Sequence, residues 1–184
     1  MKIDLFSVPI HITNIDVSKI KLISEEFKRE WVSNTESSFG FKNKITDKSY
    51  EYLMITICNL LHPHLDGKTE IELQNIWENR YVKNDFQENH IHTGSHFSFI
   101  IYVSGDKSET VFFAPHKYLL ECFYNNMFYA NSYETELRPG QIVIFPSFLE
   151  HMVKKNSNTV TYAGNLKMIL HEERQTLYKK RKAE

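Results

Sequence analysis

Cysteine is scarce in this chain, and long apolar runs are absent. Cys58 and Cys122 are the only two cysteines among 184 residues, which excludes a disulfide-rich framework and a four-thiolate zinc site. The apolar run over residues 97–103 is far shorter than the roughly 20 residues that a membrane-spanning helix needs. The first residues lack the apolar stretch of a signal peptide. We therefore expect a protein of a reducing, cytoplasmic compartment with no membrane partner.

Charge of neither sign is in excess, because 22 lysines and arginines stand against 23 aspartates and glutamates. The net charge of −1 gives no positive field to hold phosphates, so nucleic acid is not an expected partner. Aromatic residues and histidines are frequent, with 13 Phe, 10 Tyr and 9 His. The length and the 41% of hydrophobic residues suit one domain, residues 1–184, with a sheet-rich core.

The first third of the chain has a helical period. A first helix over residues 16–31 is predicted, because a capping residue precedes apolar residues three and four apart. Its stripe would be Ile20, Ile23, Phe27 and Trp31. A second helix over residues 47–61 would be capped by Asp47 and would end near Pro63. We expect a helical part over about residues 16–66.

From residue 69 onward, the helical spacing of apolar residues gives way to an alternation of apolar and polar residues. Residues 71–81 alternate between apolar and polar side chains, which predicts a long strand. Turn-like residues separate the shorter β-like segments at residues 96–104, 109–114, 141–145 and 159–170. Residues 117–130 are expected to be an irregular or helical insert. The pattern predicts a mainly β protein, with a barrel over about residues 69–172 and the N-terminal helices on its outer face.

Three histidines are candidates for a metal site. His90 and His92 would point to the same face if they lie on one strand. His151 follows the strong strand signal of residues 139–146 and would lie at a strand start, at the mouth of the barrel. Three imidazoles with open positions suit Fe, Zn, Cu, Ni or Mn, and the absence of thiolates disfavours a structural zinc site.

Other interpretations of these residues stay open. The two close histidines could be structural imidazoles that only form hydrogen bonds. His96 is a rival ligand, but on an unbroken strand it would lie farther along the same face. Iron oxygenases often use two histidines and one carboxylate, and Asp85 or Glu88 could supply the carboxylate if the strand bulges.

Several stretches, in order along nearly the whole chain, resemble a known family. They are LFSVPI at residues 5–10, WENRY at 77–81, DFQENHIH at 85–92, SFIIYV at 98–103, RPGQIVIFPSFLEH at 138–151 and TYAGN at 161–165. They are similar to the 2-oxoglutarate/Fe(II) dioxygenases found in tailed phages and bacteria, which are related to prolyl hydroxylases. The resemblance implies a double-stranded β-helix, the cupin-like jelly-roll. It also implies iron held by His90, His92 and His151.

The resemblance further implies that the small-molecule co-substrate 2-oxoglutarate chelates the iron and that an unknown substrate, for instance a protein side chain, is hydroxylated. Asn79, Tyr81 and Tyr102 would line the cavity beside the iron, because they occupy alternate strand positions.

The chain departs from the family at the position expected to bind the far carboxylate of 2-oxoglutarate. The family often has Arg six residues before the final Asn, and here that position is Thr159. Thr lacks the bidentate fork of Arg, and a buried carboxylate without a cation is costly. The substitutes to consider are the cations Lys167, Lys154 and Arg80 and the hydroxyls of Tyr81, Tyr102, Thr159 and Thr161.

Two other functions follow if 2-oxoglutarate does not bind. The chain could be a three-histidine dioxygenase that does not use 2-oxoglutarate, or a non-catalytic jelly-roll that binds a partner. Phe99 stands where the family has Gly and could narrow the pocket.

Overall fold

The computed structural model describes most of the chain. The described residues are 7–30, 33–65, 67–105, 108–118, 131–156 and 158–170. Trp31 of the expected first helix and residues 119–130 of the expected insert lie outside these ranges.

Within the described residues, strands dominate and one α-helix, α1 (Asp47–Leu61), is present. Two short 3-10 helices are η1 (Val17–Lys19) and η2 (His62–His64). The strands are β1 (His11–Asn14), β2 (Leu22–Ser24), β3 (Lys28–Glu30), β4 (Ser33–Ser37), β5 (Asn43–Ile45), β6 (Thr69–Tyr81), β7 (Asp85–His90), β8 (Phe97–Ser104), β9 (Ser108–Phe113), β10 (Ser132–Leu137), β11 (Gln141–Pro146), β12 (His151–Asn156) and β13 (Thr159–Leu170).

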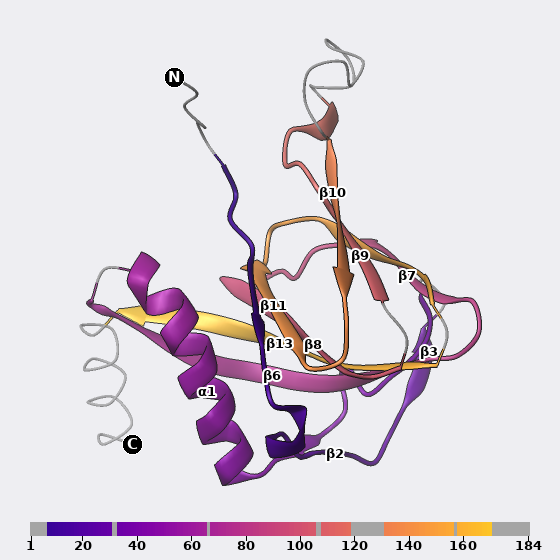
Figure 1. The fold of residues 1–184 in the computed structure, drawn as a ribbon, viewed down its shortest axis with the longest axis horizontal. Coiled ribbons are helices and arrows are strands. Elements are labelled where there is room, and N and C mark those ends of the chain that lie inside the picture. Colours follow the sequence, from indigo (N-terminus) through magenta and orange to yellow (C-terminus); the bar gives the residue numbers. More distant parts are fainter. Residues whose placement is uncertain are drawn as a thin grey trace, which may run out of the picture.

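Eleven of these strands form one rolled antiparallel sheet, the jelly-roll expected from the sequence (Figure 1). The order is β1-β11-β8-β13-β6-β4-β7-β12-β9-β10, and β3 pairs with β4. The long strands β6 and β13 pair from Thr69 to Tyr81 and form the centre of one layer, with β8 and β11 beside them. Strands β7, β12 and β9 form the other layer, and the short β4 connects the two by pairing with both β6 and β7.

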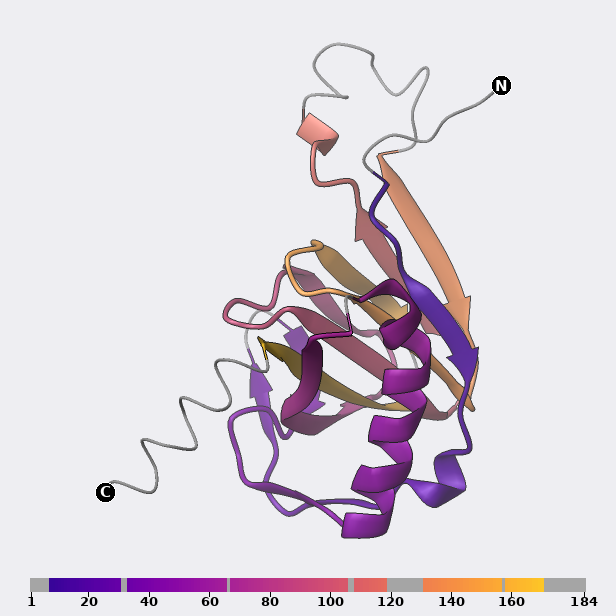
Figure 2. The ribbon, with the colours of Figure 1, turned by 90° about the vertical axis from the view of Figure 1, so that its left-hand side faces the viewer.

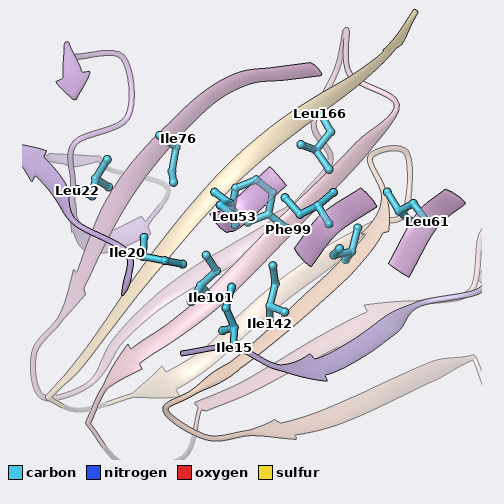
Figure 3. Packing of buried hydrophobic residues seen from close by; sticks show 12 residues of the cluster. Ile15, Ile20, Leu22, Leu53, Leu61, Ile76, Phe99, Ile101, Ile142 and Leu166 are labelled. Carbon is cyan, nitrogen blue, oxygen red and sulfur yellow. The ribbon is translucent and has the colours of Figure 1, made fainter. Parts of the chain in front are cut away.

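Helix α1 covers the outer face of the β6–β13–β8–β11 layer (Figure 2). The Thr46 side chain, rather than Asp47, caps the helix by accepting a hydrogen bond from the Ser49 amide. Apolar positions four residues apart place Leu53, Ile57 and Leu61 on one buried stripe. Figure 3 shows this stripe packed on strand residues whose side chains share the outer face, among them Phe99, Ile101, Ile142 and Leu166.

The inner face of the same layer carries the alternate residues of each strand. On it, Trp77, Tyr102 and Phe145 pack in a second apolar cluster together with residues of β9 and the β10 end. Phe99 belongs to the outer face, because it packs over Gly164, its partner in the β8–β13 register. The expectation that Phe99 narrows the pocket is therefore wrong.

The predicted first helix over residues 16–31 is also wrong. The segment contains η1 followed by β2 and β3. Asp16 does act as a cap, but its carboxylate accepts from the Ser18 amide over a single turn. Ile20 is buried whereas Ile23 is 40% exposed, so the apparent stripe does not form one face. Pairing of Leu22 with Ile45 across β2 and β5 determines the conformation instead.

The predicted second helix is confirmed as α1, and the predicted long strand as β6. The segments expected at residues 96–104, 109–114, 141–145 and 159–170 are strands β8, β9, β11 and β13, with ends that shift by a residue. Across the described part of the chain, no helix combines the length and apolar character required to span a membrane.

Candidate metal centre

Three histidine side chains from separate places in the sheet converge inside the roll. One ligand nitrogen from each of His90, His92 and His151 lies within 4.8 Å of the others. His90 ends β7 and His151 begins β12, and the two residues are directly opposite in the antiparallel register. The ring centroids of His90 and His151 are 4.3 Å apart, and those of His92 and His151 are 5.2 Å apart.

His92 reaches this cluster from a loop, because β7 ends at His90. The expectation that His90 and His92 share one strand is therefore wrong, although their rings do meet, with centroids 5.3 Å apart. The His92 amide donates to the Ser147 carbonyl, and the Ser147 amide donates to the His96 carbonyl. These bonds fix the loop against the turn that precedes His151.

The hydrogen bonds of the three rings define their tautomers. The Nδ1 atom of His90 lies 2.7 Å from the Glu88 carbonyl, and that of His151 lies 2.9 Å from the Leu149 carbonyl. The Nδ1 atom of His92 lies 2.6 Å from Asn165 Oδ1. Carbonyl and amide oxygens only accept, so each Nδ1 carries the proton. The Nε2 lone pairs are then available to a metal, the arrangement seen in histidine-ligated centres.

A buried polar network supports the His92 ring. Ser98 Oγ donates to Asn165 Oδ1 at 2.9 Å and lies 3.0 Å from His92 Nδ1. Since its single proton is used there, Ser98 accepts from the Ser147 hydroxyl at 2.8 Å. Ser98 and Ser147 are fully buried. Residues from β8, β13 and the turn after β11 thus hold one ring in place.

Burial keeps the imidazoles of His92 and His151 neutral. It lowers the pKa of His92 to about 4, against a raising effect of the Asn165 hydrogen bond and with a further lowering by His90. Burial, and next the nearby His90, also hold the pKa of His151 well below its usual value. Neutral imidazoles at neutral pH can ligate a metal without first losing a proton.

A cavity of about 450 Å³ opens beside the cluster. His90 and His92 form part of its wall, together with Trp77, Gln87 and Asn165. The Trp77 ring stands between the His92 ring, at 5.7 Å, and the Phe39 ring, at 4.9 Å between centroids. The cavity is large enough for a small molecule or one side chain to lie against the cluster.

The carboxylates and the fourth histidine considered as ligands do not join the cluster in the described residues. Asp85 is buried, and its two oxygens accept from the Val82 amide and pair with Arg29. Glu88 is exposed. His96 Nδ1 accepts from the Met168 amide. Among the residues that the structure describes, the candidate centre therefore offers three imidazole nitrogens and no carboxylate.

Comparison with known proteins agrees with this geometry. The model of the family described as "Putative 2OG-Fe(II) oxygenase" matches residues 75–162, a stretch that contains all three histidines. Residues 75–162 are therefore similar to the 2OG-Fe(II) oxygenase family. The resemblance noted in the sequence is thereby confirmed. No curated protein matches the chain significantly.

Two solved structures show that the fold is that of 2OG-Fe(II) oxygenases. An oxidoreductase of the 2OG-Fe(II) oxygenase family from Burkholderia pseudomallei is 11% identical, with a TM-score of 0.56 over 82% of this chain and 74% of that one. HygX from Streptomyces hygroscopicus, solved with nickel, 2-oxoglutarate and hygromycin B bound, is 8% identical, with a TM-score of 0.52 over 87% and 82%.

The residues predicted for the 2OG-Fe(II) oxygenase co-substrate separate into two groups. Five are buried, on the inner face of β6, β8 and β13, and they are Asn79, Tyr81, Tyr102, Thr159 and Thr161. Lys167, the sixth, is exposed. The sheet register places Thr161 opposite both Asn79 and Tyr102, and Thr159 opposite Tyr81, so the five buried residues lie in two adjacent rows.

Most polar groups of these rows are already paired. Tyr81 donates its hydroxyl to Gln87 Oε1 at 2.8 Å, and the Tyr102 hydroxyl lies 2.6 Å from Thr110 Oγ1. Asn79 Oδ1 accepts from the Ser37 hydroxyl. Thr161 Oγ1 is buried and makes no hydrogen bond of good geometry, but its hydroxyl is near enough to Tyr81 to lower the pKa of that phenol. Burial, with Tyr102 next to it, raises the pKa of Tyr81, so its phenol stays protonated.

The other cations considered as substitutes for arginine are engaged at the surface. Arg80 bonds to Glu78 at 2.6 Å and stacks over the Phe27 ring. Lys154 pairs with Glu134 and Glu109.

Several residues that shape the centre were given no role from the sequence. Ser98 and Ser147, which bond to each other and to the His92 network, lie within the stretches that resemble the family. That location was the only feature of the sequence that could have pointed to them. Asn89 and Glu150, the neighbours of His90 and His151, bond to each other at 3.1 Å, and Lys117 Nζ bonds to Glu150 at 2.6 Å. This second network joins the two histidine strands from the outside.

Proposed function

We propose that the chain is an Fe(II)- and 2-oxoglutarate-dependent oxygenase in which His90, His92 and His151 ligate the iron. The observation that carries the proposal is the set of three imidazoles, each with its Nδ1 bonded to an acceptor oxygen and with one ligand nitrogen within 4.8 Å of those of the other two. An iron ion bound here would use O2 as the oxidant, with 2-oxoglutarate converted to succinate and CO2, to insert one oxygen atom into a C–H bond of the substrate.

The protein's own residues position these groups. The carbonyls of Glu88 and Leu149 hold the rings of His90 and His151. Asn165 and Ser98 hold the ring of His92. Fixed tautomers and orientations raise metal affinity, because no ring has to reorganise on binding.

For the far end of 2-oxoglutarate, the buried rows would supply hydroxyls and no cation. Among the described residues of the inner face, Thr161 Oγ1 makes no hydrogen bond of good geometry, and it could donate to a ligand oxygen. Gln87 lines the metal cavity and accepts from Tyr81, so it connects the cavity with the rows.

For the substrate we propose a protein side chain. The cavity beside His90 and His92 has exposed apolar residues at its edge, with Phe39 at 42% and Ile91 at 48% exposure. Exposed apolar residues around a cavity favour a partner whose chain lies on the surface while one side chain enters.

Metal content and co-substrate turnover test the proposal. Protein purified without a histidine tag should bind about one equivalent of Fe(II), and His151→Ala should lose it. His116→Ala, at an exposed histidine outside the cluster, is the matched control and should retain it. With Fe(II) and air, 2-oxoglutarate should yield succinate. Iron binding without any succinate would favour the three-histidine dioxygenase that does not use 2-oxoglutarate, and no metal binding would favour the non-catalytic module.

A further inference from the structure

The cavity beside the histidines has a wall that is rich in side-chain amides and poor in charge. Among its described lining residues, Glu88 carries the one formal charge apart from the histidines, and no lysine or arginine is present. We propose that the substrate side chain that enters this cavity is an uncharged carboxamide, as in asparagine or glutamine, and that Gln87 and Asn165 recognise its carbonyl oxygen. This inference rests on the proposed function, and it names the substrate class.

Gln87 offers its amide nitrogen, rather than its oxygen, to the cavity. It lies on β7, three residues before His90, and lines the cavity. Its Oε1 atom accepts from the Tyr81 hydroxyl at 2.8 Å, and burial keeps that phenol protonated by raising its pKa. Tyr81 is buried, so this bond holds the Gln87 oxygen toward the interior. The Nε2 atom has no partner in the described part of the chain and is not sealed from solvent, so its protons are available to a ligand.

Asn165 is oriented in the same way. Its Oδ1 atom lies 2.6 Å from His92 Nδ1 and accepts from Ser98 Oγ at 2.9 Å, so both acceptor positions of the oxygen are used. Its Nδ2 atom has no partner among the described residues and is not enclosed. The side chain is only 7% exposed, and it lines the cavity. The Nδ2 group is therefore the polar part of Asn165 that a ligand in the cavity meets.

Two amide donors without a cation select a neutral acceptor. A carboxamide oxygen can accept from such donors, and its own NH2 group can donate to the Glu88 carboxylate of the same wall. A lysine side chain brings only donors, which the amide N–H groups cannot accept. A carboxylate would lose its hydration without meeting a cation. An apolar side chain of the same shape would displace water and leave both donors unpaired.

Capped amino acids, as N-acetyl N-methylamides, test this selection. They are titrated into the natural protein loaded with Zn(II), a diamagnetic substitute for iron, and the side-chain NH2 signals of Gln87 and Asn165 in 15N NMR spectra report binding. The asparagine or the glutamine derivative should shift both signals and bind about tenfold more tightly than its apolar counterpart of similar shape, leucine or methionine. Equal binding, shifts at neither amide, or a preference for the lysine derivative would overturn the inference.

Two isosteric variants locate the donors. Gln87→Glu and Asn165→Asp each keep the acceptor oxygen and remove the donor, so each should reduce the preference for the carboxamide severalfold. Gln74→Glu is the matched control, because it makes the same change at an exposed position of β6 outside the cavity wall, and it should leave the preference unchanged. A preference that survives both changes in the wall would overturn the inference. If Asn165→Asp does not fold, the natural protein and Gln87→Glu decide.

Failure of the inference and failure of the proposed function give different results. If the protein binds neither metal, or if the Fe(II)-loaded protein forms no succinate from 2-oxoglutarate, the proposed function fails, and the inference about its substrate fails with it. If succinate forms but the carboxamide derivatives are not preferred, the inference alone fails.

Discussion

Replacing Thr161 by Val should stabilise the protein in the absence of ligands. The hydroxyl is buried at 2% exposure and makes no hydrogen bond of good geometry, with only the nearby Tyr81 phenol to interact with, so folding removes it from water with little compensation. Such a group costs about 1–3 kcal/mol. Val has nearly the same shape and suits a strand at least as well, so no cavity offsets the gain. We expect the free energy of unfolding to rise by about 1–2 kcal/mol.

Urea denaturation of the metal-free protein, followed by far-UV circular dichroism, measures this change. Thr35→Val is the matched control, because Thr35 is equally buried but donates to the Phe86 carbonyl at 3.1 Å. That variant should lose about 1 kcal/mol. A loss of the same size in Thr161→Val would refute the reasoning, since it would show that the Thr161 hydroxyl has a partner within the folded chain. A gain would show that the Thr161 hydroxyl is not compensated within the folded chain.

Three further predictions concern the metal centre and the sheet. Asn165→Ala should weaken Fe(II) binding by about 10–100-fold in a metal titration, because His92 loses its acceptor, whereas Asn165→Asp keeps an acceptor and most of the affinity. Gly164→Ala should cost about 1–3 kcal/mol in urea denaturation, because its Cβ would meet the Phe99 ring and lie 2.8 Å from the Asn75 carbonyl oxygen; unchanged stability would contradict that packing. In the metal-free protein, His92 has a pKa of about 4 and stays neutral above that pH. The unfolded chain therefore binds more protons than the folded one as the pH falls from about 6.5 to 4. The free energy of unfolding should fall by up to about 3 kcal/mol over this range. Denaturation midpoints that do not change over this range would exclude a buried neutral His92.

The sequence predicted those parts of the fold in which one local pattern determines the outcome. The alternation of residues 71–81 and the apolar run before Pro146 correspond to β6 and β11, since each strand has one or two buried faces. The helical stripe of α1 was equally visible. The interpretation of residues 16–31 failed because Leu22 pairs with Ile45, a contact that a local pattern does not contain.

The sequence predicted which histidines form the candidate site, but it did not predict how the fold places them. The three histidines do meet, yet His92 is placed by a loop that bonds to Ser147, fifty-five residues away in sequence, and not by strand alternation. The missing arginine at Thr159 was visible in the sequence. The lack of any replacement among the described interior residues required the register of three strands. A phage origin and a cytoplasmic location stay predictions.

The direct pairing of His90 with His151 has a consequence for how the protein matures. The two ligands lie on strands that are joined only after about sixty residues of intervening chain have folded, and the third depends on a turn next to the later strand. A nascent chain therefore cannot assemble the trio until β12 has been synthesised and paired. Iron bound at that stage would link strands from the first and last thirds of the roll. Iron binding would then stabilise the folded sheet and would not direct its formation.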